Sequence, residues 1–209
     1  MSSFNRAPFL ASCEVIDSNA DAVRELAARV TSGAAGLGAV SSLFHWVRDC
    51  IAHTGDAGHG KLTLRASDVL RERTGLCYAK SHLLVALLRA ADIPAGLCYQ
   101  RLRFDDAGPA LTLHGLVGVL MPDENFLRID PRGNKAGIDA QFIPGREAIA
   151  FAATLPGEAD LPGVFARPIP AVVSALSAAK HWHPVETRLP DVEPEHWPAA
   201  DAEWHTPLA

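Results

Sequence analysis

A cysteine stands directly after a turn and directly ahead of a helical pattern in RERTGLCYAKSHLLVALLRAADIPAGLCYQ, residues 71–100. Apolar residues then recur at helical spacing, at Leu83, Leu84, Leu87, Leu88 and Ala91. This spacing predicts an amphipathic helix from about Cys77 to Ala91. Backbone N–H groups and the helix dipole favour a thiolate at the first turn, whereas a purely structural cysteine gains nothing from that position. Cys77 is therefore a candidate nucleophile.

The hydrophobic period changes after Pro94, which ends the helical pattern. Residues 95–104, 110–121 and 125–132 have the length and apolar content of strands, and the turn sequences DDAGP and PDEN separate them. Three successive strands with short connections predict an antiparallel sheet. Upstream, helical patterns cover about 18–33, 37–54 and 67–75, the last with Ser67 as its N-cap. Helices followed by strands indicate an α+β fold, with the cysteine helix packed on the sheet.

The character of the chain changes again beyond about residue 153. Nine prolines punctuate the rest of the sequence, around one helix-like segment at residues 171–180. We therefore expect a catalytic domain at residues 1–153. Residues 154–209 then form a proline-rich C-terminal extension with one helix that packs on the core.

Composition narrows the class of protein. The chain has 209 residues, 48% of them hydrophobic, and a net charge of −5. It has no run of Lys or Arg and no apolar stretch of about 18 residues, so we expect neither nucleic-acid nor membrane binding. The four cysteines form no CxxC pair, and the N-terminus lacks the pattern of a secretory signal. These features favour a reduced, cytoplasmic protein.

Three residues in the predicted elements have complementary chemistry: Cys77 heads the helix, His114 lies in the second strand and Asp130 ends the third. Sixteen residues separate His114 from Asp130, which is about what a strand, a tight turn and a neighbouring strand consume. A thiolate nucleophile needs an imidazole beside it, and a carboxylate behind the imidazole fixes its orientation. Taken singly, however, the three also fit a core cysteine, a hydrogen-bonded strand histidine and a turn aspartate. Periodicity alone leaves both interpretations open.

The sequence resembles the bacterial transglutaminase-like superfamily over roughly residues 20–150. The similarity lies in Gly75-x-Cys77 at the helix start, the run LLVALLRAADIPA, the strand with His114 and the segment IDPRGNK that contains Asp130. The segment LFHWVRDCIAH upstream also resembles that family. These motifs are specific when they occur together and in this order.

The resemblance implies a papain-like core and a Cys-His-Asp triad that acts on amides, without a cofactor. Cys77 would be the nucleophile, His114 the general base and acid, and Asp130 the orienting carboxylate. The family includes proteases, amidases, transamidating enzymes and members that have lost catalysis, so a peptide or amide substrate is expected and the reaction stays open. The family often has an aromatic residue after the histidine, where this chain has Gly115. We expect Gly115 and Gly118 to mark a bulge or the close approach of a ligand.

Other residues are weaker candidates. Tyr78 and Gly75 near the helix start, and Tyr99 on the first strand, are expected to contact substrate, although a structural role is open for each. The side chain of the oxyanion hole is unassigned, with His53 and Trp46 as candidates.

Two rival hypotheses remain. The first is a non-catalytic interaction protein that keeps the fold. The second is a metal-binding protein that uses the C-terminal histidines His181, His183, His196 and His205. No carboxylate or cysteine stands at ligand spacing in that segment, and no calcium-loop pattern is present, so we expect no metal site. The sequence leaves the oligomeric state open.

Overall fold

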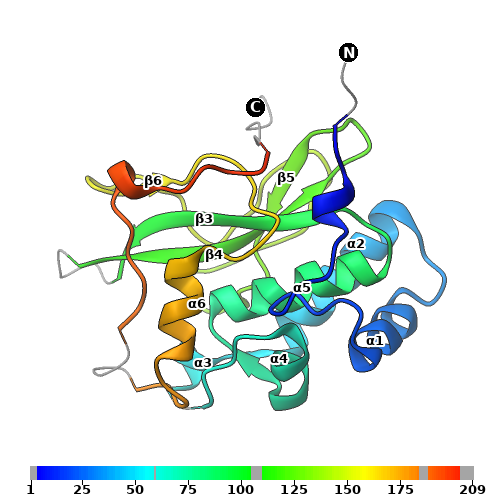
Figure 1. Cartoon of the computed structure of the whole chain (residues 1–209), viewed down its shortest axis with the longest axis horizontal. Helices are drawn as coiled ribbons and strands as arrows, with labels where there is room; N and C mark the ends of the chain where they lie inside the picture. The colour runs from blue at the N-terminus through cyan, green and yellow to red at the C-terminus, as the bar shows by residue number, and fades with distance from the viewer. Residues whose placement is uncertain (1–3, 59, 105–109, 184–187, 203–209) are drawn as a thin grey trace.

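The computed structural model describes residues 4–58, 60–104, 110–183 and 188–202, and it has the α+β fold predicted from the sequence (Figure 1). The helices are η1 (Ala7–Phe9), α1 (Asp21–Thr31), α2 (Gly36–Cys50), α3 (Thr54–Ala57), α4 (Ala66–Glu72), α5 (Cys77–Ala90), α6 (Pro170–Ser177) and η2 (Pro194–His196). The strands are β1 (Ala52–His53), β2 (Thr74–Gly75), β3 (Ala95–Arg103), β4 (Leu111–Leu120), β5 (Phe126–Ile129) and β6 (Ala159–Asp160). The turn expected at residues 105–109 lies outside the described residues. No helix in these ranges is long and apolar enough to cross a lipid bilayer.

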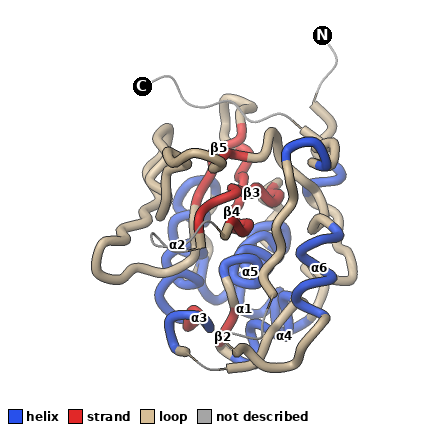
Figure 2. Tube along the Cα trace, turned by 90° about the vertical axis from the view of Figure 1, so that its left-hand side faces the viewer, coloured by secondary structure: helices blue, strands red, loops and turns tan. Residues whose placement is uncertain are grey.

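Helix α5 lies at the centre of the molecule, between the sheet and the N-terminal helices (Figures 1 and 2). It contacts β3 and β4 with one side and α1, α2 and α4 with the others. Every residue from Cys77 to Arg89 is buried. The predicted bounds of this helix are confirmed, but its predicted amphipathic character is wrong, because protein covers it on all sides.

The main sheet is antiparallel, in the order β5-β4-β3-β6, and confirms the predicted sheet. The pairing of β3 with β4 runs without interruption from one end to the other, so neither Gly115 nor Gly118 forms a bulge. A Cβ atom on Gly115 would lie 2.9 Å from the Cα of Tyr78 and 3.1 Å from its backbone nitrogen. Gly115 thus permits the close approach of helix α5. We expected a ligand at this position, and the backbone of the helix lies there instead. Gly118 makes room for Val164 in the same way.

The hydrogen-bond partner at the start of α4 differs from the predicted one. The helix begins at Ala66, and Ser67 lies within its first turn. The backbone N–H of Ser67 donates to Asp17 at 3.0 Å, and its hydroxyl donates to the same carboxylate at 2.5 Å. The prediction of Ser67 as N-cap is wrong, because a carboxylate distant in sequence accepts from the helix start and also complements its dipole.

The C-terminal segment is part of the same core as the helices and sheet. Strand β6 pairs with the outer edge of β3, and Leu161, Phe165, Val172 and Leu176 join the main hydrophobic cluster. Farther along, the carbonyl of Pro190 accepts from the N–H of Leu113 on β4 at 2.8 Å. The helix expected in this segment is α6. The boundary at residue 153 stays a prediction.

The contact between Gly115 and α5 gives a direct test of the packing. We expect Gly115→Ala to lower the free energy of unfolding by about 1–3 kcal/mol, because the new methyl group meets helix backbone that cannot rotate away. The measurement is urea unfolding followed by circular dichroism. Gly38→Ala in α2 is the matched control, since its methyl would meet only Ala34 at 3.7 Å. Equal stabilities of the two variants would contradict the packing described.

Candidate active site

Three elements bring Cys77, His114 and Asp130 to one place. Cys77 is the first residue of α5, His114 lies within β4, and Asp130 directly follows β5. The antiparallel pairing of β4 with β5 sets Asp130 on the diagonal from His114, on the same face of the sheet. The contact between Gly115 and Tyr78 then places the residues that precede them, His114 and Cys77, beside each other. All three side chains are buried.

Asp130 is fully buried and its oxygens are hydrogen-bonded. Its Oδ2 accepts from His114 Nε2 at 2.8 Å and from the N–H of Ala150 at 3.1 Å, and its Oδ1 accepts from the N–H of Arg132 at 2.9 Å. Burial alone would raise the pKa of this carboxyl, but the charge of His114 and these hydrogen bonds lower it below its ordinary value. Asp130 is therefore ionised near neutral pH and fixes the ring of His114.

The other ring nitrogen of His114, Nδ1, is left for the Cys77 sulfur, because Nε2 is bound to Asp130. Burial would raise the pKa of Cys77, but the charge of His114, with hydrogen bonds from His114 and His53, lowers it to about 6. Burial would lower the pKa of His114, yet the charges of Asp130 and Cys77 raise it well above its ordinary value. Near neutral pH the pair is thus a thiolate and an imidazolium.

An aromatic ring packs against His114, although no aromatic residue follows it in the sequence. Phe151, in the loop after β5, meets the imidazole edge to face with ring centroids 5.1 Å apart. Arg132 lies over the same phenyl ring at 5.6 Å. Phe151 therefore supplies the wall that the motif around His114 lacks. No sequence pattern marks it, because it lies in irregular chain.

A cavity of about 830 Å³ opens in front of Cys77 and His114. Its lining includes the charged side chains of Asp56, Arg132 and Lys135 and the apolar side chains of Phe151 and Leu155. Trp182 and Leu189 of the C-terminal segment also line it. A site of this size admits a substrate group of a few residues, with both apolar and polar contacts.

The family model of the transglutaminase-like superfamily matches residues 24–131, which include Cys77, His114 and Asp130. This span is more than half of the chain. The chain belongs to the transglutaminase-like superfamily. No curated protein sequence matches it.

Solved structures show a similar fold at low identity. A candidate cysteine protease from Cytophaga hutchinsonii superposes with a TM-score of 0.50 at 22% identity, over 62% of this chain and 43% of that one. The periplasmic domain of TgpA from Pseudomonas aeruginosa, bound to ethylmercury, gives a TM-score of 0.47 at 22% identity, over 62% of this chain and 50% of that one. This member of the superfamily thus spans half or less of these two solved chains.

Of the residues expected to bind substrate, one lines the cavity and two do not. Tyr78 lines the cavity, while its hydroxyl donates to the carbonyl of Leu113. Gly75 is packed instead against Thr63 and Ala79, outside the cavity lining. Tyr99 is also outside the lining.

Tyr99 and Trp46 have structural surroundings. Tyr99 is buried, and its hydroxyl accepts from the N–H of Ile169 at 3.4 Å. Trp46, a candidate for the oxyanion hole, lies under the guanidinium of Arg73 at 4.8 Å and does not line the cavity. The other candidate, His53, does line it.

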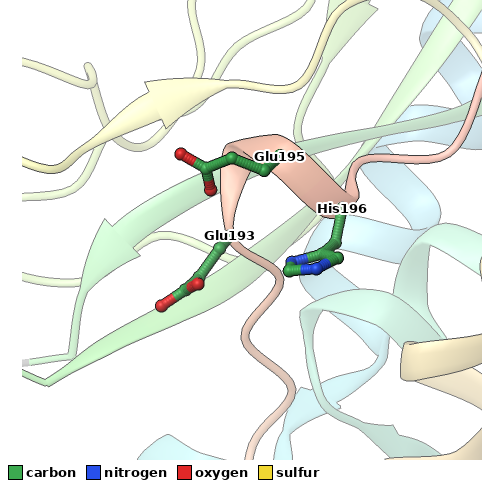
Figure 3. Close-up of side chains that lie close together, drawn as sticks. All are labelled: Glu193, Glu195 and His196. Carbon is green, nitrogen blue, oxygen red and sulfur yellow. The ribbon is translucent and has the colours of Figure 1, made fainter.

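The C-terminal segment brings Glu193, Glu195 and His196 together on and beside η2 (Figure 3). Their potential ligand atoms lie within 4.8 Å of one another, so the prediction that no carboxylate stands at ligand spacing in this segment is wrong for His196. All three side chains are exposed. The hydrogen bonds from Arg101 to Asp191 raise the pKa of that arginine most, and the charges of the two glutamates add to this effect. His205 lies outside the described residues.

The polarised thiol predicts selective alkylation. At pH 6 about half of a thiol with a pKa of about 6 is thiolate, against ~0.3% for an ordinary cysteine. We expect iodoacetamide at pH 6 to label Cys77 at least ~10-fold faster than Cys13, Cys50 or Cys98, measured by peptide mapping. Burial raises the pKa of Cys98 to about 12, so that thiol should be the slowest.

The control is His114→Ala. Removal of the imidazolium leaves burial unopposed by its charge, so the pKa of Cys77 should rise and its advantage at pH 6 should disappear. Equal labelling rates at all four cysteines of the unmodified protein would show that the thiol is not activated.

Proposed function

We propose that this chain is a cysteine-dependent hydrolase or acyl-transfer enzyme that acts on peptide or amide substrates through Cys77, His114 and Asp130. The observation that carries the proposal is the buried 2.8 Å hydrogen bond from His114 Nε2 to Asp130, which directs Nδ1 to the thiol at the start of α5. A histidine that served only the core would not need a buried carboxylate behind it and a cavity in front of it.

The chemistry follows from these positions. The Cys77 thiolate attacks the carbonyl carbon of the amide, and the π electrons of the carbonyl pass to its oxygen. When the C–N bond breaks, His114 gives its Nδ1 proton to the leaving amine, and a thioester remains on the sulfur. Water or a second amine then loses a proton to His114 and attacks the thioester. The C–S bond breaks and the thiolate is restored.

The walls of the cavity support a peptide-like substrate. Its volume of about 830 Å³ lies within the range for small-molecule sites. Phe151 and Leu155 offer an apolar surface for a side chain, and Arg132 and Lys135 offer hydrogen-bond donors for carbonyl groups. Substrates with an apolar residue beside the scissile amide are therefore the first to test.

A non-catalytic interaction protein is the second candidate, and one observation favours it. Trp182 and Leu189 of the C-terminal segment line the cavity, so that segment narrows the space open to a substrate. Against it stands the lowered pKa of Cys77, because a binding surface gains nothing from an activated thiol. The proposed acyl transfer therefore explains more of the site.

Cys77→Ala tests the enzyme directly. We expect the unmodified protein to cleave members of a peptide and amide library, and Cys77→Ala to show no turnover above background, because the attacking atom is gone. Parallel reactions with and without a primary amine, analysed by mass spectrometry, separate hydrolysis from transamidation. Cys50→Ala, a change at an exposed cysteine, should keep full activity. An unchanged rate in Cys77→Ala would refute the mechanism.

Asp130→Asn tests the orienting carboxylate. The amide keeps the size of the side chain but removes the negative charge. That charge keeps the hydrogen of His114 on Nε2, where it donates to residue 130. We expect kcat to fall on the order of 10²–10⁴-fold with a small change in KM, since the loss falls on proton transfer. Steady-state kinetics on a substrate from the library measures both constants. A change confined to KM would assign Asp130 to substrate binding instead.

A further inference from the structure

His53 lines the cavity beside Cys77 and forms a hydrogen bond with the Cys77 sulfur. It belongs to β1, whose parallel pairing with β2 sets it beside Gly75, two residues before Cys77. Its side chain is 13% exposed and lines the same cavity as Cys77 and His114. The thiol is therefore flanked by two imidazoles that come from different elements.

The contacts of His53 determine which ring nitrogen carries hydrogen. The N–H of Asp56, in the first turn of α3, donates to His53 Nδ1 at 3.3 Å. A ring nitrogen that accepts a hydrogen bond carries no hydrogen, so the hydrogen is on Nε2. The Asp56 carboxylate lies 3.6 Å from Nδ1, beyond hydrogen-bond range. Its Oδ1 instead accepts from Arg132 at 2.9 Å and from Lys135 at 2.7 Å.

The ring of His53 is also held in position by packing. A Cβ atom on Gly55 would lie 3.2 Å from Cε1 and 3.4 Å from Nδ1 of the ring. The imidazole thus lies against the backbone of the turn that follows it, with one nitrogen bound to that turn. Its remaining N–H is fixed before any substrate arrives, and such a preorganised donor stabilises charge at little cost in reorganisation.

We propose that His53 is a catalytic hydrogen-bond donor, which binds the carbonyl oxygen of the substrate through Nε2–H as Cys77 attacks. This inference rests on the proposed function, because the oxygen belongs to the acyl group under attack. The second donor is the backbone N–H of Cys77, which as the first residue of α5 has no partner within the helix. As the C–S bond forms, the carbonyl π electrons move to the oxygen, and both donors meet the new charge. No proton leaves His53 in this step.

The two histidines therefore have separate tasks. His114 has a carboxylate behind it and exchanges a proton with the leaving and entering groups. His53 has a backbone N–H behind it and donates a hydrogen bond only. This division predicts that glutamine replaces His53 well, because its side-chain amide also donates, whereas glutamine cannot replace His114.

The test uses two reactions of the same sulfur. Acylation by p-nitrophenyl acetate builds an oxyanion, whereas alkylation by iodoacetamide does not. Nitrophenolate release and peptide mapping of the acetyl group on Cys77 measure the first, and mass spectrometry measures the second. The variants are His53→Ala and His53→Gln, with His45→Gln on α2 as the matched control, since His45 does not line the cavity. Circular dichroism melts establish that each variant is folded.

We expect His53→Ala to slow acylation of Cys77 by ~100-fold, the effect of removing one such donor. Alkylation should fall less than ~5-fold, because the thiolate loses the hydrogen bond from His53 but keeps the larger stabilisation by His114. His53→Gln should recover most of the acylation rate, and His45→Gln should match the unmodified protein. Equal losses in acylation and alkylation would overturn the inference, because the whole effect of His53 would then come from its action on the thiolate. Acylation that is unchanged in His53→Ala would overturn it too, and would leave the proposed function intact. If the unmodified protein is alkylated at Cys77 but never acylated there, the proposed function itself fails, and the inference with it.

Discussion

The site depends on the contact between the backbone of Tyr78 and the bare Cα of Gly115. It brings the first turn of a buried helix against the middle of a strand more closely than any side chain would allow. The residues adjoining this contact are Cys77 and His114, so one backbone packing distance determines where sulfur and imidazole meet. The helix cannot retreat, because α1, α2 and α4 pack behind it. The reactive geometry is therefore a property of the core.

A charged triad in such a core is costly, and its hydrogen bonds show how the cost is offset. Asp130 has no exposed surface, but one imidazole and two backbone N–H groups satisfy it. The two N–H groups come from Arg132 and Ala150, in the loops after β5. Those loops also carry Phe151, which covers His114. Burial here strengthens the attraction between the charges, and that attraction keeps the thiol ionised.

How much the sequence predicts differs between parts of the site. Helix α5 and the β3–β4–β5 meander have strong hydrophobic periodicity. Because β4 and β5 form a hairpin, the number of residues between His114 and Asp130 predicts that the two lie close together. Gly115 is visible in the sequence, but its meaning is not, because the contacting residue belongs to another element. His53 and Phe151 could not be placed in the same way. The first lies in a two-residue parallel strand and the second in irregular chain, and neither gives a hydrophobic period.

The two carboxylates near the cavity explain why two histidines at one sulfur need not be redundant. Asp130 accepts a hydrogen bond from His114, and its charge raises the pKa of that ring and favours the imidazolium. Asp56 is shared by Arg132 and Lys135, and the pKa of its carboxyl is lowered by them even though burial opposes this. In the proposed mechanism His114 holds the proton, while His53 accepts the Asp56 N–H at Nδ1 and keeps Nε2–H for the substrate oxygen. Proton transfer and charge stabilisation are separated by what stands behind each ring.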